Sequence, residues 1–278
     1  MRYPNQKLNK LKSILKKYNA AIIAFSGGAD STFLAKVASH TIDNILLVTA
    51  TSESFPFYEL EESKKLASYL KLAHRIIITE EIKIPGYQNN TPDRCYYCKT
   101  ELFTLINHIA KKEGFDIVFD GSNADDYNDY RPGRKAAGAQ GILSPLADAG
   151  FTKKEIRKYS KQYNLPTADK PALACLASRI PYGETITKTK LDRISLTEYN
   201  IKQLGFTLFR VRSHENLARL EFMSHEVDKA WEMKNRINMI CKDSGFHYVS
   251  IDLEGYRAGS MNESLQRIPG NSLITENK

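Results

Sequence analysis

The sequence contains a hexapeptide with the composition of a phosphate-binding loop, Ser26-Gly27-Gly28-Ala29-Asp30-Ser31. Two adjacent glycines allow close approach of the backbone and positive φ angles, so that successive N–H groups can point at one phosphate. The helix expected to follow would add its N-terminal N–H groups, and Ser26, Ser31 and Thr32 would add hydroxyl donors. Because Asp30 would repel a phosphate unless a cation stood between them, we expect Asp30 to bind Mg²⁺.

The hexapeptide is neither of two common nucleotide-binding motifs. The Walker A spacing G-x4-G-K-[ST] is missing together with its lysine, and so is the G-x-G-x-x-G pattern of dinucleotide-binding enzymes. A plain turn from a strand into a helix, with Ser and Asp as capping residues, is the alternative interpretation.

A second polar cluster runs from Asp120 to Asp126, after an apolar run typical of a buried strand. The carboxyl ends of parallel strands line the ligand crevice of open α/β sheets. We expect contacts to metal, ribose or phosphate from Gly121, Ser122, Asn123 and Asp126. Arg131 is a candidate anion clamp, and a plain Asx turn is the alternative for the cluster.

Three of the four cysteines are candidates for metal or sulfur chemistry. Cys95 and Cys98 have C-x-x-C spacing, and Cys175 lies in the run Ala174-Cys175-Leu176-Ala177-Ser178-Arg179. Three thiolates can hold three irons of a [4Fe-4S] cluster and leave the fourth iron open. A zinc site with a fourth ligand and a redox-active or metal-free thiol pair are the alternatives. Cys241, near Ile237 and Ile240 on a predicted helix, is expected in the core.

Two arginines alternate along a predicted strand. Arg210 and Arg212 would therefore point to the same face, where guanidinium groups can grip the phosphate of a nucleotide substrate. A surface ladder of ion pairs with Glu221 on the neighbouring strand is the alternative.

The elements that position these residues follow an alternating pattern. Four apolar runs typical of buried strands occupy Ala20–Phe25, Asn44–Thr51, Arg75–Thr79 and Asp116–Asp120. Helical periodicity occupies the stretches Ser31–Ser39, Tyr58–Leu72, Thr100–Lys112 and Thr152–Tyr163. Continuous apolar strands between amphipathic helices predict an α/β fold with a doubly wound, Rossmann-like parallel sheet covered on both faces.

The pattern changes after Pro181-Tyr182-Gly183. A helix, a two-strand hairpin, a helix and a third strand are expected at Lys190–Leu204, Leu208–Arg212, Arg219–Met223, Val227–Lys242 and Tyr248–Leu253. We therefore predict a first domain at residues 1–183, a small α+β domain for substrate binding or oligomerisation at 184–262, and a disordered polar tail at 263–278.

The hexapeptide, placed between strand and helix, resembles the PP-loop of the N-type ATP pyrophosphatases. The run Gly121 to Gly133 and the run Lys170 to Gly183 are similar to those of one branch, the LarE family of ATP-dependent sulfur transferases. The resemblance extends through Arg210-Val211-Arg212 and Gly255-Tyr256-Arg257.

The resemblance implies a reaction. A carboxylate attacks the α-phosphate of ATP, pyrophosphate leaves, and the adenylated carboxylate of pyridinium-3,5-biscarboxylic acid mononucleotide becomes a thiocarboxylate, in the biosynthesis of the nickel-pincer nucleotide cofactor. It also implies a set of site residues: Arg210, Arg212 and Arg257 for the substrate phosphate, Glu198 and Glu221 as active-site carboxylates for a second metal or a base, and Ala50, Thr51 and Ser52 at the adenine. Lys99 and Arg179 could neutralise the adenylate or the thiolates.

The cysteines depart from the best-known members of the family. Those members sacrifice one cysteine, at the position of Cys175, which donates its sulfur and becomes dehydroalanine. The additional Cys95 and Cys98 resemble a cluster-containing variant, in which an open iron would pass sulfide to the adenylate and spare the protein. Sacrifice of Cys175 remains the alternative.

Charge and composition exclude several classes of protein. With 278 residues, 42% apolar and 26% charged, the chain has an ordinary globular composition, and no apolar run reaches membrane-spanning length, so a cytoplasmic protein is expected. Of the net charge of +8, six charges lie in residues 1–29, which carry six Lys or Arg and no acid, for the most part on a predicted amphipathic helix. A nucleic-acid partner is therefore not expected.

Other functions fit the sequence less well. A tRNA thiolase with the same loop would need a broad basic surface or an RNA-binding module. An ammonia-fed amide ligase would leave three cysteines unexplained. An iron–sulfur or nucleotide carrier is the non-enzyme alternative, and release of pyrophosphate from ATP that depends on Mg²⁺ and on Asp30 would distinguish the enzyme from it. The partners expected are a small nucleotide substrate, further copies of the chain as a trimer or hexamer, and a protein that donates sulfur or a cluster.

Overall fold

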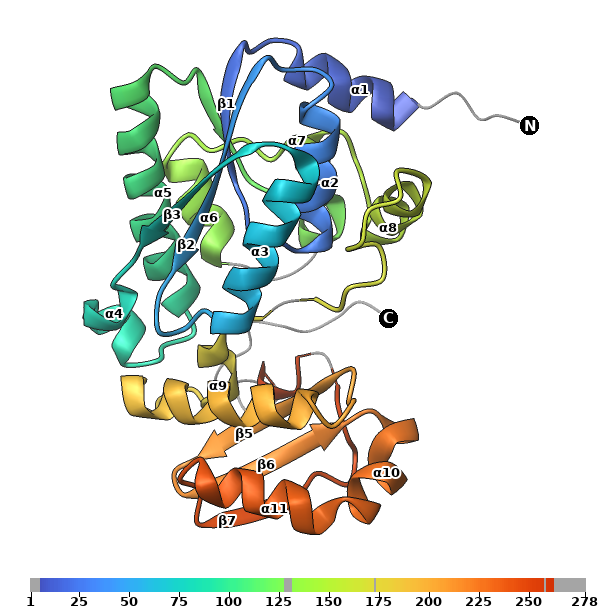
Figure 1. Ribbon diagram of the computed structural model, residues 1–278. Coiled ribbons are helices and arrows are strands. Elements are labelled where there is room, and N and C mark those ends of the chain that lie inside the picture. Colours follow the sequence, from blue (N-terminus) through green and yellow to red (C-terminus); the bar gives the residue numbers. More distant parts are fainter. Residues whose placement is uncertain (1–5, 128–131, 173, 258, 263–278) are drawn as a thin grey trace. The chain divides into compact units, whose positions relative to one another are not determined.

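The computed structural model describes residues 6–127, 132–172, 174–257 and 259–262 (Figure 1). The chain forms two compact units, one of Met1–Tyr87 with Asp93–Leu173 and one of Gln88–Pro92 with Ala174–Lys278. The sequence predicts a boundary at residue 183, whereas contacts within the chain assign residues 174–183 to the second unit. An ion pair between Arg179 and Glu198 holds this segment there.

A parallel sheet of four strands forms the centre of the first unit. The strands have the order β3-β2-β1-β4 and the bounds β1 Ala20–Ala24, β2 Asn44–Thr51, β3 Ala73–Ile78 and β4 Ile117–Phe119. An isolated parallel bridge joins Phe119 to Leu143 and extends the pairing beside β4. All four strands lie where the apolar runs predict them, within a few residues at each end.

The helices of this unit cover both faces of the sheet. Their bounds are α1 Gln6–Leu15, α2 Ala29–Ala38, α3 Phe57–Leu70, α4 Pro85–Gln88, α5 Arg94–Glu113, α6 Pro132–Ala139, α7 Pro145–Asp148 and α8 Lys153–Gln162, with single 3₁₀ turns at Glu81–Lys83 and Ala124–Tyr127.

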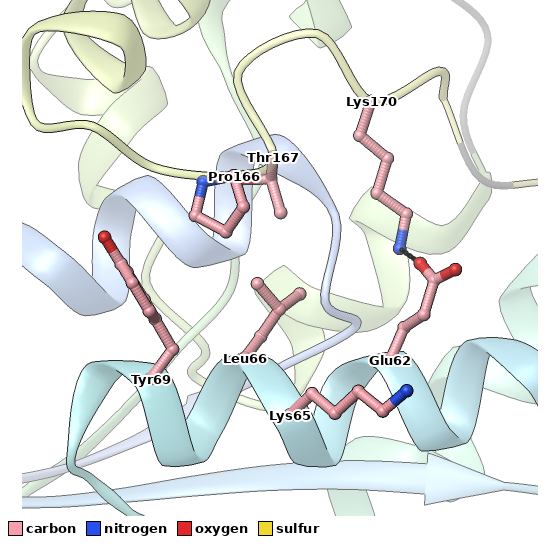
Figure 2. A pocket seen from close by; sticks show the side chains of 7 residues that line it. All are labelled: Glu62, Lys65, Leu66, Tyr69, Pro166, Thr167 and Lys170. Carbon is pink, nitrogen blue, oxygen red and sulfur yellow. Dashed lines mark ion pairs between the residues drawn. The ribbon is translucent and has the colours of Figure 1, made fainter.

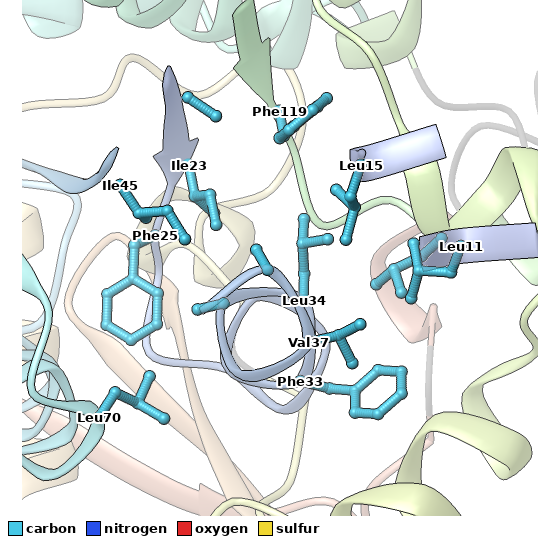
Figure 3. Close-up of a cluster of buried hydrophobic side chains, with 14 of the residues drawn as sticks. Leu11, Leu15, Ile23, Phe25, Phe33, Leu34, Val37, Ile45, Leu70 and Phe119 are labelled. Atoms are coloured by element: carbon cyan, nitrogen blue, oxygen red, sulfur yellow. The ribbon is translucent and has the colours of Figure 1, made fainter. Parts of the chain in front are cut away.

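Successive residues of a strand pack into two separate hydrophobic cores, one on each face of the sheet. Ile23 of β1 packs in one core with Phe33 and Leu34 of α2 (Figure 3), whereas its neighbour Ile22 packs in the other with Phe103 of α5. The central strand β1 is therefore buried on both faces, whereas the edge strand β3 is exposed or half-buried along its length. The four-stranded parallel sheet between helices confirms the predicted α/β class.

The CxxC pair lies within a helix, which the sequence does not predict. Helix α5 begins at Arg94, whereas the expected helix begins at Thr100. Buried apolar residues such as Phe103 and Ile106 indicate the later turns, but Cys95 and Tyr97 in the first turns are exposed. The hydrophobic period therefore cannot be seen in the sequence before residue 100.

The second unit contains a mixed sheet of three strands. Strand β5 Phe209–His214 pairs antiparallel with β6 Leu217–Phe222, which pairs parallel with β7 Tyr248–Ile251. The helices are α9 Lys188–Lys202, α10 Val227–Glu232 and α11 Lys234–Asp243, with 3₁₀ turns at Leu176–Arg179, Ser224–Glu226 and Ser260–Asn262. The single helix predicted over residues 227–242 is divided at Met233, and nothing in the local contacts explains the division.

Two further expectations concern burial and membranes. Cys241 is fully buried, as predicted, and burial raises the pKa of its thiol to about 12. Within the described stretches, no helix combines the length and the apolar composition needed to cross a bilayer. The predicted tail at 263–278 lies outside the described residues.

Candidate active site

The loop between β1 and α2 is the predicted phosphate-binding loop, and its backbone requires glycine at position 27. Gly27 has φ +68°, and a Cβ there would lie 3.2 Å from the Cβ of Ser63, so both conformation and space favour glycine. Ser26 Oγ accepts a 3.3 Å hydrogen bond from the Gly28 N–H and lies 3.3 Å from Ser31 Oγ. The structure thus brings together the loop residues that the sequence predicts.

Two polar atoms at the start of α2 are buried without a hydrogen-bond partner among the described residues. They are Thr32 Oγ1 and Asp30 Oδ1. The other carboxylate oxygen of Asp30, Oδ2, accepts from Lys153 Nζ at 2.6 Å and from Asn123 Nδ2 at 3.2 Å. An unpartnered carboxylate oxygen beside a phosphate-binding loop fits the oxygen ligands that Mg²⁺ requires.

The second polar cluster adjoins this loop. A Cβ on Gly121 would lie 3.1 Å from the Ser31 N atom, so the absence of a side chain permits the contact. Asp120 accepts hydrogen bonds from the hydroxyl groups of Ser122 and Ser144, at 2.8 and 2.7 Å. β1 and β4 are neighbours in the sheet, so the two clusters meet at one edge.

The remaining residues predicted at the nucleotide are placed as follows. Asp126 is buried and its Oδ2 accepts from the Asn123 N–H at 3.0 Å. Ala50 and Thr51 end β2, the other neighbour of β1 in the sheet. Arg131 lies outside the described residues.

The cysteines of interest are distributed over both units. Cys95 and Cys98 lie three residues apart on α5, hence on one face of the helix, with Cys95 exposed and Cys98 half-buried. Exposed Cys175 belongs to the second unit. Lys99 is exposed, with its ammonium 5.4 Å from the centre of the Phe103 ring. Three thiolates have the donor chemistry of an iron–sulfur site.

A buried ion pair supports the segment that carries Cys175. Arg179 donates from Nε and Nη2 to the two carboxylate oxygens of Glu198, each at 2.9 Å, and both residues are at most 3% exposed. Arg179 Nη1 also donates to the carbonyl oxygens of Ala174 and Cys175, at 2.8 and 3.2 Å. The pair therefore restrains the backbone of the candidate sulfur residue.

Electrostatics keep Glu198 ionised. Burial by itself raises the pKa of this carboxyl, but the charge and hydrogen bonds of Arg179, the charge of Arg210 and the Val211 N–H outweigh it. The pKa of Glu198 therefore lies below its ordinary value. Its proposed catalytic role stays a prediction, and the contacts show it bound to Arg179.

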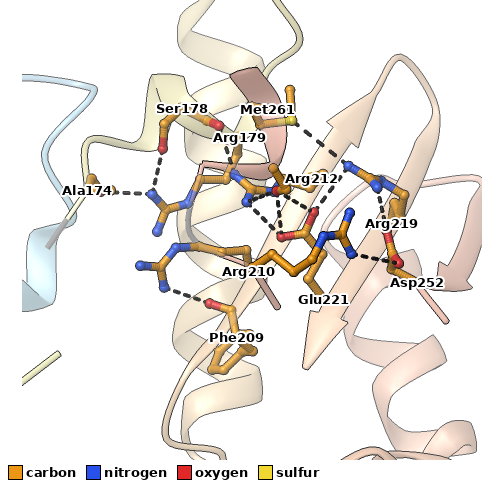
Figure 4. Close-up of polar contacts among 12 residues, drawn as sticks. Ala174, Ser178, Arg179, Phe209, Arg210, Arg212, Arg219, Glu221, Asp252 and Met261 are labelled. Atoms are coloured by element: carbon orange, nitrogen blue, oxygen red, sulfur yellow. Dashed lines mark hydrogen bonds and ion pairs between the residues drawn. The ribbon is translucent and has the colours of Figure 1, made fainter. Parts of the chain in front are cut away.

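A group of arginines surrounds Glu221 in the same unit (Figure 4). Arg212 donates to Glu221 at 2.7 Å, to the Ser178 carbonyl at 2.9 Å and to Ser260 Oγ at 2.9 Å. Arg219 forms a second ion pair with Glu221, at 3.1 Å. The ion pair between Arg212 and Glu221, which was the alternative interpretation of the sequence, is present in the structure. It is buried and not on the surface, because Glu221 has no exposed area.

The other two predicted phosphate ligands lie beside this ladder. Arg210 donates to the Phe209 carbonyl at 2.7 Å and lies 5.1 Å from the centre of the Tyr256 ring. Arg257 pairs with exposed Glu254 at 2.7 Å. Burial and the charge of Arg179 lower the pKa of Arg210, which still carries its charge at neutral pH. Around Glu221, arginine side chains outnumber the carboxylates that pair with them, and the remaining positive charge suits an anionic ligand.

Relatives of the chain show its family. No family model matches it. A protein of Lactiplantibacillus plantarum named pyridinium-3,5-bisthiocarboxylic acid mononucleotide synthase is 35% identical over 259 residues, which cover 92% of this chain and 94% of that protein. This chain belongs to the LarE family. Uncharacterized proteins of Synechocystis sp. and Methanocaldococcus jannaschii are 40% and 33% identical and cover 94% and 91% of this chain.

This LarE-family chain also places two lysines at the phosphate loop that sequence reasoning missed. Lys153 binds Asp30, as described above. Lys170 donates to the Gly27 carbonyl at 3.2 Å and to Glu59 at 2.7 Å, and pairs with Glu62 at 2.7 Å. Burial alone would lower the pKa of Lys170, but the two carboxylates raise it above the ordinary value.

Lys170 also lines a pocket of about 530 Å³ (Figure 2). The other lining residues come from α3 and from the segment after α8: Glu62, Lys65, Leu66, Tyr69, Pro166 and Thr167. Nothing in the sequence pattern relates Lys153 or Lys170 to the loop. A T-x-x-E capping box at Thr152 marks where α8 starts, but not which part of the sheet that start faces.

Proposed function

We propose that this chain is an ATP-dependent sulfur transferase that converts carboxylates of pyridinium-3,5-biscarboxylic acid mononucleotide into thiocarboxylates. The observation that carries the proposal is the likeness, over nine-tenths of the chain, to a relative named for the thiocarboxylate product. Two features of the structure support it independently. The loop with Asp30 offers donors and a carboxylate for a triphosphate with its metal, and the arginines around buried Glu221, of which Arg212 is buried and Arg210 and Arg257 half-buried, offer positive charge for a second anion.

In the first step, a carboxylate oxygen of the substrate attacks the α-phosphorus of ATP. The bond from this phosphorus to the bridging oxygen breaks, pyrophosphate leaves, and an acyl adenylate forms. The loop N–H groups and the hydroxyl groups of Ser26 and Ser31 can stabilise the charge that develops on pyrophosphate. Asp30 would hold the Mg²⁺ that neutralises the same charge.

In the second step, sulfide attacks the carbonyl carbon of the adenylate, the carbon–oxygen bond to phosphate breaks, and AMP leaves. Arg210, Arg212 and Arg257 would hold the phosphate of the mononucleotide and orient its ring. Cys95, Cys98 and Cys175 would hold a [4Fe-4S] cluster, which supplies the sulfide when bound. Arg179 would keep the Cys175 backbone in place.

Sulfur transfer can be tested on the whole protein. Purified anaerobically and reconstituted with iron and sulfide, it is expected to convert the pyridinium biscarboxylate mononucleotide with Mg-ATP into thiocarboxylate, AMP and pyrophosphate. Mass spectrometry of the product and the protein reports the reaction and the sulfur source together. If the mass of the protein is unchanged after turnover, the cluster is supported as the route of the sulfur. If Cys175 has lost the mass of hydrogen sulfide, the sulfur came from that cysteine, and sacrifice takes the place of the cluster in the proposal. Absence of any thiolated product would refute the proposed function.

Iron binding gives a separate prediction for the cysteines. Reconstituted wild-type protein is expected to bind about four irons per chain, and Cys95→Ala less than about one, because two thiolates hold a cluster poorly. Iron content and visible absorbance measure the difference. Cys241→Ala is the matched control, since that thiol is buried in the core. Equal iron uptake by Cys95→Ala and wild type would contradict the cluster.

A further inference from the structure

We propose that Lys153 is a triphosphate ligand that exchanges its partner, leaving the Asp30 carboxylate for a phosphate oxygen when Mg-ATP binds. The proposal rests on the proposed use of ATP and assigns a role to a residue that neither the loop motif nor the predicted site contains. Three observations carry it: the ion pair itself, the way the lysine is held, and the charge that the loop must accommodate.

The ion pair joins Asp30, in the first turn of α2, to Lys153 at the start of α8. Lys153 Nζ is 2.6 Å from Asp30 Oδ2, and the side chains are 32% and 19% exposed. Asn123 donates to the same oxygen, while Asp30 Oδ1 is buried with no hydrogen-bond partner among the described residues. The Lys153 ammonium thus neutralises the same Asp30 carboxylate that would bind Mg²⁺.

The start of α8 is fixed by three contacts. Thr152 accepts from the Glu155 N–H at 3.3 Å, and Glu155 accepts in return from the Thr152 N–H at 2.9 Å, which forms a capping box. The Lys153 N–H donates to Asp125 Oδ2 at 2.7 Å, in the cluster after β4. Glu155 also pairs with Lys7 of α1 at 2.7 Å. The backbone of Lys153 is therefore anchored, while its four-carbon side chain can turn.

The charges of the ligands explain the exchange. A divalent ion competes with a monovalent ammonium for one carboxylate, and the phosphates that arrive with it carry more negative charge than the ion neutralises. Lysine is a compact, flexible point charge suited to phosphate oxygens. Because the ammonium contacts an anion both before and after binding, the exchange does not leave a partly buried charge unpaired.

Binding measured without turnover tests the exchange. Isothermal titration of the whole protein with Mg-pyrophosphate and with Mg-α,β-methylene-ATP gives Kd values for wild type, Lys153→Met and Lys153→Arg. Lys153→Met is expected to weaken both ligands about 10- to 100-fold, as loss of a charge-assisted contact would. Lys153→Arg should recover most of that loss. Exposed Lys154→Met is the matched control, expected to stay within about twofold.

An Asp30→Asn background separates phosphate binding from simple neutralisation of Asp30. Adding Lys153→Met to Asp30→Asn should still weaken pyrophosphate at least about tenfold, because the lost partner is the phosphate. No further effect in that background, or equal affinities of Lys153→Met and wild type, would overturn the assignment alone. Failure of wild type to bind either ligand would overturn the proposed use of ATP, and this assignment with it.

Discussion

Asp30→Ala is expected to reduce the Mg²⁺-dependent release of pyrophosphate from ATP by at least about 10³-fold, the scale of losing a metal that stabilises the leaving group. Asp30 contributes the unpartnered carboxylate oxygen at the phosphate loop. Without it, Mg²⁺ would lose the protein ligand proposed for it, while the loop N–H groups would still be able to hold the phosphates. Pyrophosphate release in the presence of the mononucleotide substrate, measured against Mg²⁺ concentration, checks this result.

The matched control for this variant is Asp43→Ala, which removes an exposed carboxylate from the turn before β2. Its rate of pyrophosphate release should stay within about twofold of wild type. A circular dichroism spectrum and a melting temperature close to wild type establish that Asp30→Ala is folded. If folded Asp30→Ala kept more than about a tenth of the wild-type rate, a metal-binding role for this carboxylate would be untenable.

Glu198→Ala is expected to lower the free energy of unfolding by about 3–5 kcal/mol, because it removes one partner from a buried ion pair. The guanidinium of Arg179 would stay buried without the carboxylate that accepts two of its hydrogen bonds. Urea unfolding followed by the fluorescence of Trp231, which lies in the same unit, measures the loss. A double variant, Arg179→Met with Glu198→Leu, should recover part of it, because no charge is then buried.

The same carboxylate gives a pH dependence with a defined sign. The pKa of Glu198 in the folded chain lies below its ordinary value of 4.5. Its contribution to stability is therefore complete above about pH 4.5 and is lost as the pH falls through the folded pKa. Glu198→Gln should lose this part of the acid sensitivity, so that its stability falls less than that of wild type below pH 4.5.

Exposed Glu232→Ala on α10 is the control and should change the stability by less than about 0.5 kcal/mol. A loss below about 1 kcal/mol in Glu198→Ala would show that the pair contributes no more than a surface ion pair. Because Arg179 donates to the carbonyl oxygens of Ala174 and Cys175, we also expect Glu198→Ala to slow sulfur transfer more than adenylation.

Local features of the sequence predict much of the fold and the phosphate loop. The apolar runs before Phe25 and Thr51 indicate buried strands, since every residue of a strand inside a parallel sheet meets a helix on one face or the other. Gly27, Gly28 and Asp30 are adjacent in the chain, so their chemistry can be read without knowing the fold. Predictions are poorest where no buried apolar residue marks the helical period, as in the first turns of α5, where the buried residue is Arg94.

The charge partners of the site depend on the tertiary structure. Lys153 and Lys170 look like ordinary surface lysines in the sequence, yet they contact Asp30 and Gly27 across more than a hundred residues. Likewise, Glu198 could be a catalytic carboxylate by type, and only the packing of α9 against the turn at Leu176–Arg179 shows that it holds Arg179. By itself the sequence determined the α/β class and the place of the glycine-containing turn between β1 and α2, because periodicity and glycine spacing are local. Which cation neutralises which carboxylate was decided by the tertiary structure, because ion pairs form between elements that only folding brings together.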